Sequence, residues 1–168
     1  VFLIEDSFAE QTYMAADKRR TELIHRDIYD EQGNVVTPSP VRGYFSSKYV
    51  DPDFIGERTS ARPYLIRYSD IALVFAEAAG PDEGLALVNR IRERAGIPDL
   101  PAGMGLEEFR TAVIQERALE LAFEGNRLYD LRRTASVTST VPEASKLSEE
   151  EAAFYPIPQR ELDLNPNR

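Results

Sequence analysis

The sequence predicts a mainly α-helical protein, in which a helical hairpin and a long third helix follow an irregular N-terminal segment with short β-strands. Two runs of apolar residues at helical spacing, between residues 67 and 96, predict the hairpin. A longer run over Leu106–Arg133 predicts the third helix. Frequent prolines and glycines before residue 67 indicate loops. We therefore expect a loop-rich part at residues 1–66 and a helical part at residues 67–168, which together form one domain fragment.

Short elements are expected in the N-terminal segment. A short helix is predicted within Asp6–Ala16 and a short strand within Gly43–Tyr49. Thr21–Tyr29 and Val35-Val36 flank the run Asp30–Asn34, whose composition favours a β-hairpin turn. Prolines and glycines place the remainder in long loops, and long loops in compact domains are often functional.

The helical hairpin is predicted by the positions of its apolar residues. The first helix carries a stripe at i, i+3, i+7 and i+11, made of Tyr68, Ile71, Phe75 and Ala79. Gly80-Pro81 ends this helix, and the second is expected to end at Gly96. Two helices joined by a short break predict an antiparallel hairpin of the tetratricopeptide kind. The aromatic residues of the helices are expected in the core; they are Tyr68, Phe75, Phe109 and Phe123.

The third helix carries carboxylates at a fixed spacing. Glu116, Glu120 and Glu124 lie four residues apart and share one helix face, where each like-charged pair costs roughly 0.2–0.5 kcal/mol unless compensated. We expect arginines to compensate them, some of which come from the hairpin: Arg67, Arg90 and Arg92. Within the third helix, the predicted structural ion-pair network consists of Glu116, Arg117, Glu120, Glu124, Arg127 and Asp130.

The same glutamates raise the alternative of glycoside hydrolysis by an acid and a base. Adjacent arginines lower carboxyl pKa values, which does not suit a general acid. The structural network is therefore the favoured interpretation, and we expect no enzymatic activity.

Composition excludes several other functions. The net charge of −9 argues against nucleic-acid binding, which needs a basic face. The sequence has no cysteine and a single histidine, His25, so neither a thiolate site nor a histidine-based metal site is expected. It contains no serine-nucleophile motif and no phosphate-binding glycine loop. We expect no metal and no cofactor.

Aromatic rings in the N-terminal segment are candidates for ligand contacts. Tyr44, Tyr49, Phe54 and Tyr64 lie among hydroxyl, ammonium and carboxylate side chains. This mixture suits sugars, whose C–H faces stack on rings while their hydroxyls need polar partners. The alternative is that the rings anchor the segment to the helices. The absence of tryptophan argues against a strong stacking platform.

The C-terminal part is expected to be less regular. Residues 134–153 are rich in Ser, Thr, Ala and Glu, which predicts a flexible connector with a turn of helix at Ser148–Ala153. Phe154–Pro158 is expected to be extended, because each proline disfavours the helical conformation of the residue before it.

Three motifs follow one another in the chain. The first runs from Arg67-Tyr68-Ser69-Asp70 through Ala76-Glu77-Ala78 to Val88-Asn89-Arg90-Ile91-Arg92-Glu93-Arg94-Ala95-Gly96. The second comprises Ile114, Glu116-Arg117, Glu120-Leu121, Glu124-Gly125, Arg127 and Asp130-Leu131-Arg132-Arg133. The third comprises Phe154-Tyr155-Pro156-Ile157-Pro158, Glu161 and Asn165-Pro166. Together they resemble the SusD/RagB family, the surface glycan-binding lipoproteins of the Bacteroidota. Residues 1–66 resemble it loosely, at Asp17-Lys18-Arg19 and Lys48-Tyr49.

The resemblance implies a non-catalytic nutrient-binding protein on the external face of the outer membrane. Such a protein captures oligosaccharide or polysaccharide for a TonB-dependent, SusC-like transporter. SusD-like proteins are longer and carry a signal peptide and a lipidated cysteine, so the chain is expected to be a C-terminal portion whose lipid anchor lies outside it. The family's ligand residues do not belong to the matched motifs, and none is transferred here. A helical-repeat module that binds protein instead of glycan stays open as the alternative.

An exposed apolar face is also expected. Tetratricopeptide-like stacks bury each hairpin against its neighbours, so a portion without the family's N-terminal repeats would expose part of its hairpin. Residues off the main stripes are the candidates, namely Leu73, Val74 and Leu87.

Overall fold

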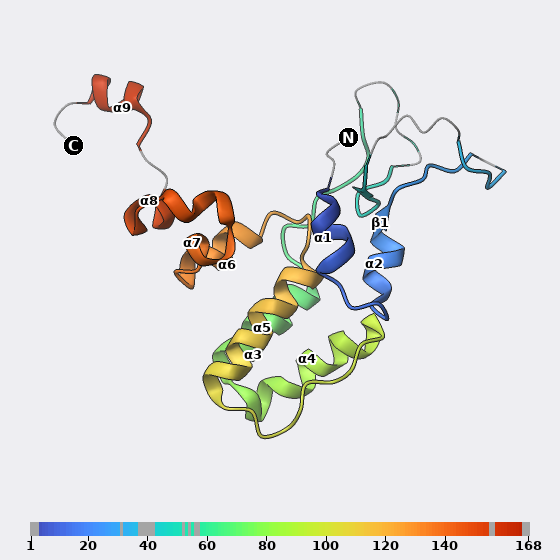
Figure 1. Ribbon diagram of the computed structural model, residues 1–168, viewed down its shortest axis with the longest axis horizontal. Coiled ribbons are helices and arrows are strands. Elements are labelled where there is room, and N and C mark those ends of the chain that lie inside the picture. The colour runs from blue at the N-terminus through green and yellow to red at the C-terminus, as the bar shows by residue number, and fades with distance from the viewer. Residues whose placement is uncertain are drawn as a thin grey trace. The chain divides into compact units, whose positions relative to one another are not determined.

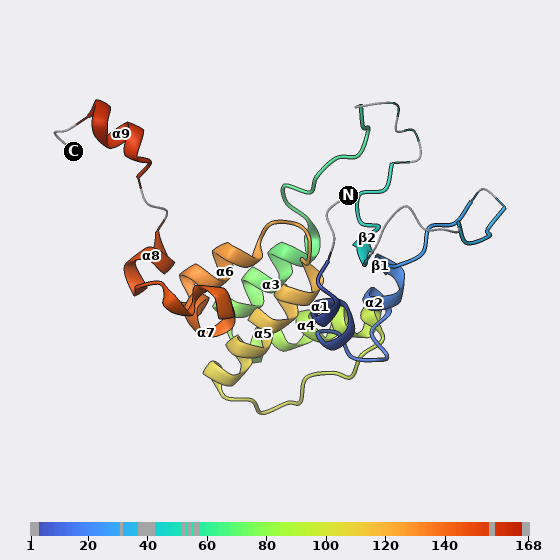
Figure 2. The same cartoon turned by 45° about the horizontal axis from the view of Figure 1, so that its top comes forward.

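The computed structural model describes residues 4–30, 32–36, 43–51, 53, 55, 58–154 and 157–165 (Figures 1 and 2). It divides into two compact units, Val1–Glu124 and Gly125–Arg168, each of which is described by itself. The boundary expected between residues 66 and 67 stays a prediction.

Three helices form the body of the first unit. α3 (Tyr68–Ala79) and α4 (Pro81–Ala95) form a hairpin that turns at Gly80, whose φ of +83° is a conformation that glycine adopts readily. α5 (Leu106–Glu120) packs against both, and it lies along α3 in Figures 1 and 2. The predicted mainly α fold with a tetratricopeptide-like hairpin is confirmed.

The core of these three helices uses a different face of α3 from the one predicted. Leu73 and Phe109 are fully buried there, with Ala72 and Ala76 beside them. The small alanines allow α4 to approach α3 closely, which places the hairpin contact on their side. The expectation that the helical aromatics are buried is therefore right for Phe109 and wrong for three others. These are Tyr68, Phe75 and Phe123, which are 65%, 46% and 36% exposed.

The apolar face that α3 exposes is thus the predicted stripe itself. It contains Tyr68, Ile71 and Phe75, joined by Val74. Val74 was expected to be exposed and is, whereas Leu73 lies in the core.

The third helix is shorter than the sequence pattern predicts. α5 ends at Glu120, residues Leu121–Gly125 form turns, and α6 (Arg127–Arg133) begins the second unit. Phe123 and Gly125 have φ values of +68° and +83°, which a continuous helix does not allow. Where the helix ends, side chains donate hydrogen bonds to carbonyls that backbone N–H groups would satisfy in a continuous helix. Lys48 Nζ donates to the carbonyls of Glu120 and Ala122, both at 3.0 Å. The prediction of one helix over Leu106–Arg133 is therefore wrong. The spacing of residues within that segment gives no sign of the distant side chains that donate to its carbonyls.

The N-terminal segment contains short elements. α1 (Asp6–Gln11) and α2 (Lys18–Leu23) precede the strand β1 (Ile24–His25), which pairs antiparallel with β2 (Phe45–Ser46). Ala9, Tyr13 and Ile24 pack on Leu119 of α5, which fixes the segment to the helices.

The expected β-hairpin turn is present. Tyr29 and Val35 form an antiparallel bridge, and the Asp30 carboxylate accepts the backbone N–H groups of Gln32 at 2.9 Å and Asn34 at 2.8 Å. The flanking run, however, is helical at its start: Thr21–Leu23 belongs to α2, because Asp17 caps that helix by accepting the Arg19 N–H at 3.0 Å.

The second unit is more ordered than the flexible connector expected at residues 134–153. After α6 it contains α7 (Val137–Thr140), a 3₁₀ helix η1 (Pro142–Lys146), α8 (Glu149–Ala153) and α9 (Gln159–Leu164). Leu131, Val137, Ala144 and Ala152 form its small core. The helix expected near Ser148 is α8, with a capping box between Ser148 and Glu151. Phe154 is extended, whereas Tyr155 and Pro156 lie outside the described residues.

Gly84 offers a test of how closely α3 and α4 pack. Alanine would normally stabilise a helix interior by about 1 kcal/mol over glycine. At Gly84 an added Cβ would lie 2.7 Å from Ala76 Cα and 2.8 Å from its carbonyl oxygen. We expect Gly84→Ala to lower the free energy of unfolding by about 1–3 kcal/mol in urea titrations.

Gly105→Ala is the matched control, because its φ of −65° suits alanine and no atom lies within 4 Å of the added Cβ. A Gly84→Ala variant as stable as the wild type would contradict the close packing of α3 on α4.

Candidate functional site

Three carboxylates lie at the end of α5 or just after it, and each forms ion pairs with cations from other parts of the first unit. Glu116 and Glu120 are one turn apart on the helix, and Glu124 follows in the turn. Their side chains are at most 2% exposed. Unpaired buried carboxylates would be strongly unfavourable, so the surrounding cations determine whether this arrangement is stable.

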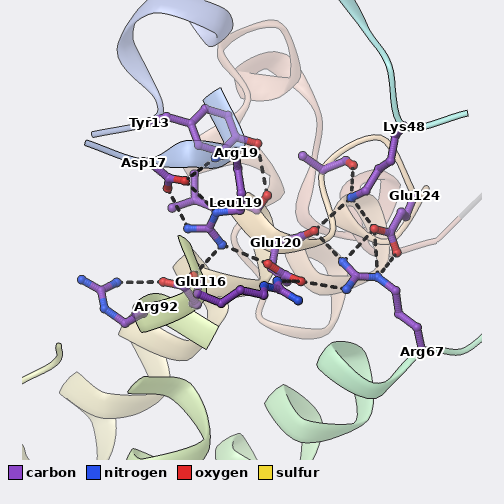
Figure 3. Close-up of polar contacts among 12 residues, drawn as sticks. Tyr13, Asp17, Arg19, Lys48, Arg67, Arg92, Glu116, Leu119, Glu120 and Glu124 are labelled. Carbon is purple, nitrogen blue, oxygen red and sulfur yellow. Dashed lines mark hydrogen bonds and ion pairs between the residues drawn. The ribbon is translucent and has the colours of Figure 1, made fainter. Parts of the chain in front are cut away.

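Glu116 joins two cations from different parts of the first unit (Figure 3). Arg19 Nη1 donates to one carboxylate oxygen and Arg92 Nη1 to the other, both at 2.7 Å. Arg19 belongs to α2 and Arg92 to α4. One side chain of α5 therefore connects the N-terminal segment to the hairpin.

Arg19 is held in place by the residue that starts its own helix. Asp17 accepts Arg19 Nε at 2.9 Å and Arg19 Nη2 at 2.7 Å, a two-point contact. The remaining nitrogen, Nη1, donates to Glu116 and also to Glu120 at 3.2 Å. Beside this group, the Tyr13 hydroxyl donates to the Leu119 carbonyl at 3.1 Å, and burial raises the pKa of Tyr13 to about 12.

Glu120 is at the centre of the network. Its second oxygen accepts Arg67 Nη1 at 2.7 Å and Arg94 Nη2 at 2.5 Å. Arg67 also donates through Nε and Nη2 to Glu124, at 2.9 and 2.8 Å. Lys48 completes the group by pairing with Glu124 (Figure 3).

The pKa values follow from these contacts. Burial raises the pKa of a carboxyl, but the hydrogen bonds from Arg94 and Arg67 outweigh burial and lower the pKa of Glu120 to about 2. The pKa of Glu124 is lowered as well, because Arg67 and Lys48 outweigh the effect of burial. Both groups are therefore ionised at neutral pH, which does not suit a general acid.

A cleft of about 400 Å³ opens beside the network. The residues that line it include Arg67, Arg94 and Glu120 of the network and also Tyr64, Ser47 and Glu22. Tyr64 is 50% exposed. Most residues that line the cleft are therefore polar or charged, and Tyr64 supplies the aromatic ring among them. Among the residues that the structure describes, no cluster of His, Asp and Glu side chains has a geometry that would hold a metal ion.

Comparison with known proteins decides the family. The model of the SusD family matches residues 17–146, which include every member of the network. The chain belongs to the SusD family. Similar proteins from Formosa agariphila include SusD-like protein P2, which is 37% identical over 90 residues, covering 46% of this chain and 18% of that protein. SusD-like protein P38 is 32% identical over 114 residues, covering 61% of this chain and 22% of that protein.

Solved structures of the family have the same fold. A SusD homolog from Bacteroides thetaiotaomicron matches 89% of this chain and 39% of its own, with a TM-score of 0.66 and 29% identity. A SusD superfamily protein from Parabacteroides distasonis matches 98% of this chain and 40% of its own, with a TM-score of 0.77 and 22% identity. The chain spans about a fifth of the length of the two curated relatives from Formosa agariphila.

Of the other predicted network residues, Arg117 has a different partner in the first unit, and Arg127 and Asp130 belong to the second unit. Arg117 donates to Asp70 at 2.8 Å, and Asp130 accepts Arg133 at 2.9 Å in the second unit. Arg127 also belongs to the second unit, and burial lowers its pKa. Arg90 is exposed on α4.

The sequence reasoning missed four members of the network: Asp17, Arg19, Lys48 and Arg94. A signal for three of them was available, since Asp17-Lys18-Arg19 and Lys48-Tyr49 are the loose family matches in the N-terminal segment. Arg94 lies within the first motif, two residues after Arg92.

The four aromatic candidates separate into groups. The rings of Tyr49 and Tyr64 are 5.8 Å apart, and the Arg67 guanidinium lies 5.9 Å from the Tyr64 ring. Tyr44 instead packs on the cluster around Tyr13, and its hydroxyl donates to Glu10 at 3.0 Å. Phe54 lies outside the described residues.

Replacement of Glu120 by glutamine tests the network through its pH dependence. A carboxyl with a lowered folded-state pKa stabilises the protein fully above its ordinary pKa of 4.5, and this stability is lost as the pH falls towards 2. The shift corresponds to roughly 3 kcal/mol. We expect Glu120→Gln to be destabilised by about 3 kcal/mol at pH 7, because buried guanidinium groups lose their partner. Between pH 4.5 and 2.5 the variant should lose less further stability than the wild type.

Urea unfolding at several pH values measures both effects, and Glu108→Gln, an exposed position on the same helix, is the control. If Glu120→Gln matched Glu108→Gln at pH 7 and in its pH slope, Glu120 would not be the centre of a stabilising network.

Proposed function

We propose that this protein is a non-catalytic binding protein for glycan or another nutrient on the external face of the outer membrane. In this proposal it delivers oligosaccharide to a TonB-dependent, SusC-like transporter, and its lipid anchor lies outside this chain. Membership of the SusD family over residues 17–146 is the observation that carries the proposal. The absence of catalysis is supported by the ionised state of Glu120, which the arginines maintain at neutral pH.

The proposed sugar contacts are Tyr44, Tyr49, Phe54 and Tyr64. Support is strongest for Tyr64, which lines the cleft beside the network, and for Tyr49, whose ring lies 5.8 Å from the Tyr64 ring. Arg67 fixes the chain after Tyr64 through five hydrogen bonds to Glu120 and Glu124. A ring held on a rigid framework loses little conformational entropy when it stacks on a sugar.

One observation favours the alternative, a helical module that binds protein. Tyr68, Ile71, Val74 and Phe75 form an exposed apolar face on α3 without a charged residue among them. Exposed faces of this kind often bind protein partners. A glycan site is instead expected where rings lie beside polar groups, as Tyr64 does.

Glycan binding can be tested directly with the purified chain. We expect a glycan array to give saturable binding, and calorimetry to give dissociation constants between about 1 μM and 1 mM. Tyr49→Ala and Tyr64→Ala should each weaken binding about fivefold, because one stacking ring contributes on the order of 1 kcal/mol. No new reducing ends should appear during incubation.

Tyr29→Ala is the matched control, since Tyr29 is an exposed tyrosine of the same segment outside the proposed site. Absence of binding to every glycan would contradict the proposal and favour the protein-binding alternative.

A further inference from the structure

Two arginines of α4 lie on the same helix face beside exposed tyrosine rings. Arg90 and Arg94 are four residues apart, whereas Arg92 between them is directed to Glu116. Arg94 lines the cleft that contains Tyr64, and it also lines a second cleft of about 430 Å³ together with Arg90 and Tyr68. Tyr68 is 65% exposed. A chain of sugars that followed both clefts would therefore pass the Arg94 guanidinium.

These arginines have donors to offer a ligand. The Arg94 side chain is 59% exposed, and its hydrogen bond within the described residues goes from Nη2 to Glu120. A guanidinium has five N–H donors, so most of those on Arg94 are open to solvent. Arg90 is exposed and has no ion pair within the described part of the chain. Two like charges at this spacing repel each other until an anion binds between them.

The charge balance of the surroundings favours an anionic group. The network contains five cations, namely Arg19, Lys48, Arg67, Arg92 and Arg94. It contains four carboxylates, namely Asp17, Glu116, Glu120 and Glu124. The network therefore carries one net positive charge, although the whole chain has a net charge of −9. Arg94 is the most exposed of its five cations. Glu22 lines the first cleft and Glu93 the second, and both add negative charge there, but both are exposed, so water weakens their effect.

We infer that Arg90 and Arg94, with the ring of Tyr64, bind the acidic group of a saccharide, a uronate carboxylate or a sulfate ester. This inference rests on the proposed function. Guanidinium groups match the planar carboxylate and the sulfate oxygens through paired hydrogen bonds. The Tyr64 ring stacks on the apolar face of the sugar that carries the acid or of its neighbour. Ser47 and Glu22, which line the same cleft, provide partners for sugar hydroxyls.

The test uses three oligosaccharides of equal length: a galacturonate oligomer, the same oligomer with its carboxyl groups reduced to alcohols, and a sulfated derivative of the reduced form. Calorimetry at low salt measures each against the wild type, Arg90→Gln, Arg94→Gln and Tyr64→Ala. We expect the two arginine variants to weaken binding of the acidic oligomers about tenfold each, as for loss of a charge-assisted hydrogen bond, and to leave the neutral oligomer unaffected. Tyr64→Ala should weaken all of them. Preference for the uronate or for the sulfate identifies which acid the site takes.

Arg160→Gln, an exposed arginine of the second unit, is the charge-matched control. Arg94→Gln also removes a contact to Glu120, so Arg90→Gln, which removes none within the described residues, tests the site without this complication. Equal binding of acidic and neutral oligomers, or unchanged affinity in both arginine variants, would overturn the inference and leave the proposed function standing. Binding of none of the three, together with a blank glycan array, would count against the proposed function itself.

Discussion

Three carboxylates buried at one end of α5 set the main constraint on the first unit. Each needs cationic hydrogen-bond donors, because burial removes the water that would otherwise solvate it. The donors come from α2, the loop after β2, the residue before α3, and α4. The short segments around Arg19, Lys48 and Arg67 contribute little to the main core of α3, α4 and α5, and the charge contacts give each a defined place against α5. The network therefore joins an irregular segment of short elements to a regular helical body.

The same contacts explain the local structure at the end of α5. Arg67 and Lys48 donate to carboxylates and also to the carbonyls of Glu120 and Ala122, which lack helical partners. The helix can end at Glu120 because these cations satisfy its last carbonyls. The turn that follows keeps Glu124 beside Arg67, although Glu124 is no longer on the helix. The same two cations, Arg67 and Lys48, thus both satisfy carbonyls at the end of α5 and pair with Glu124.

Local sequence signals predicted the features that depend on local spacing. The i, i+4 glutamates indicated a shared charge site, and Gly80 and Gly96 marked the ends of the hairpin helices. Two distant partners of these glutamates, Arg67 and Arg92, were also predicted, whereas other features set by distant residues were not. The stripe of Tyr68, Ile71 and Phe75 has helical spacing, but the small residues Ala72 and Ala76 pack against α4 and leave the stripe exposed. Arg19 and Lys48 lie far along the chain from Glu116 and Glu124, with which they pair, and no periodicity links them.

The network also bears on the proposed binding role, because its member Arg67 lines the same cleft as Tyr64. Tyr64 lies three residues before Arg67, so the contacts that hold Arg67 also restrict the ring. The central claim is that these charge contacts couple the N-terminal segment to α5. A double-mutant cycle with Arg19→Met and Glu116→Gln, measured by urea unfolding at pH 7, tests it most directly. The two residues are 2.7 Å apart across the boundary between α2 and α5. The account predicts a coupling free energy of at least about 1 kcal/mol, whereas effects that add to within about 0.5 kcal/mol would contradict it.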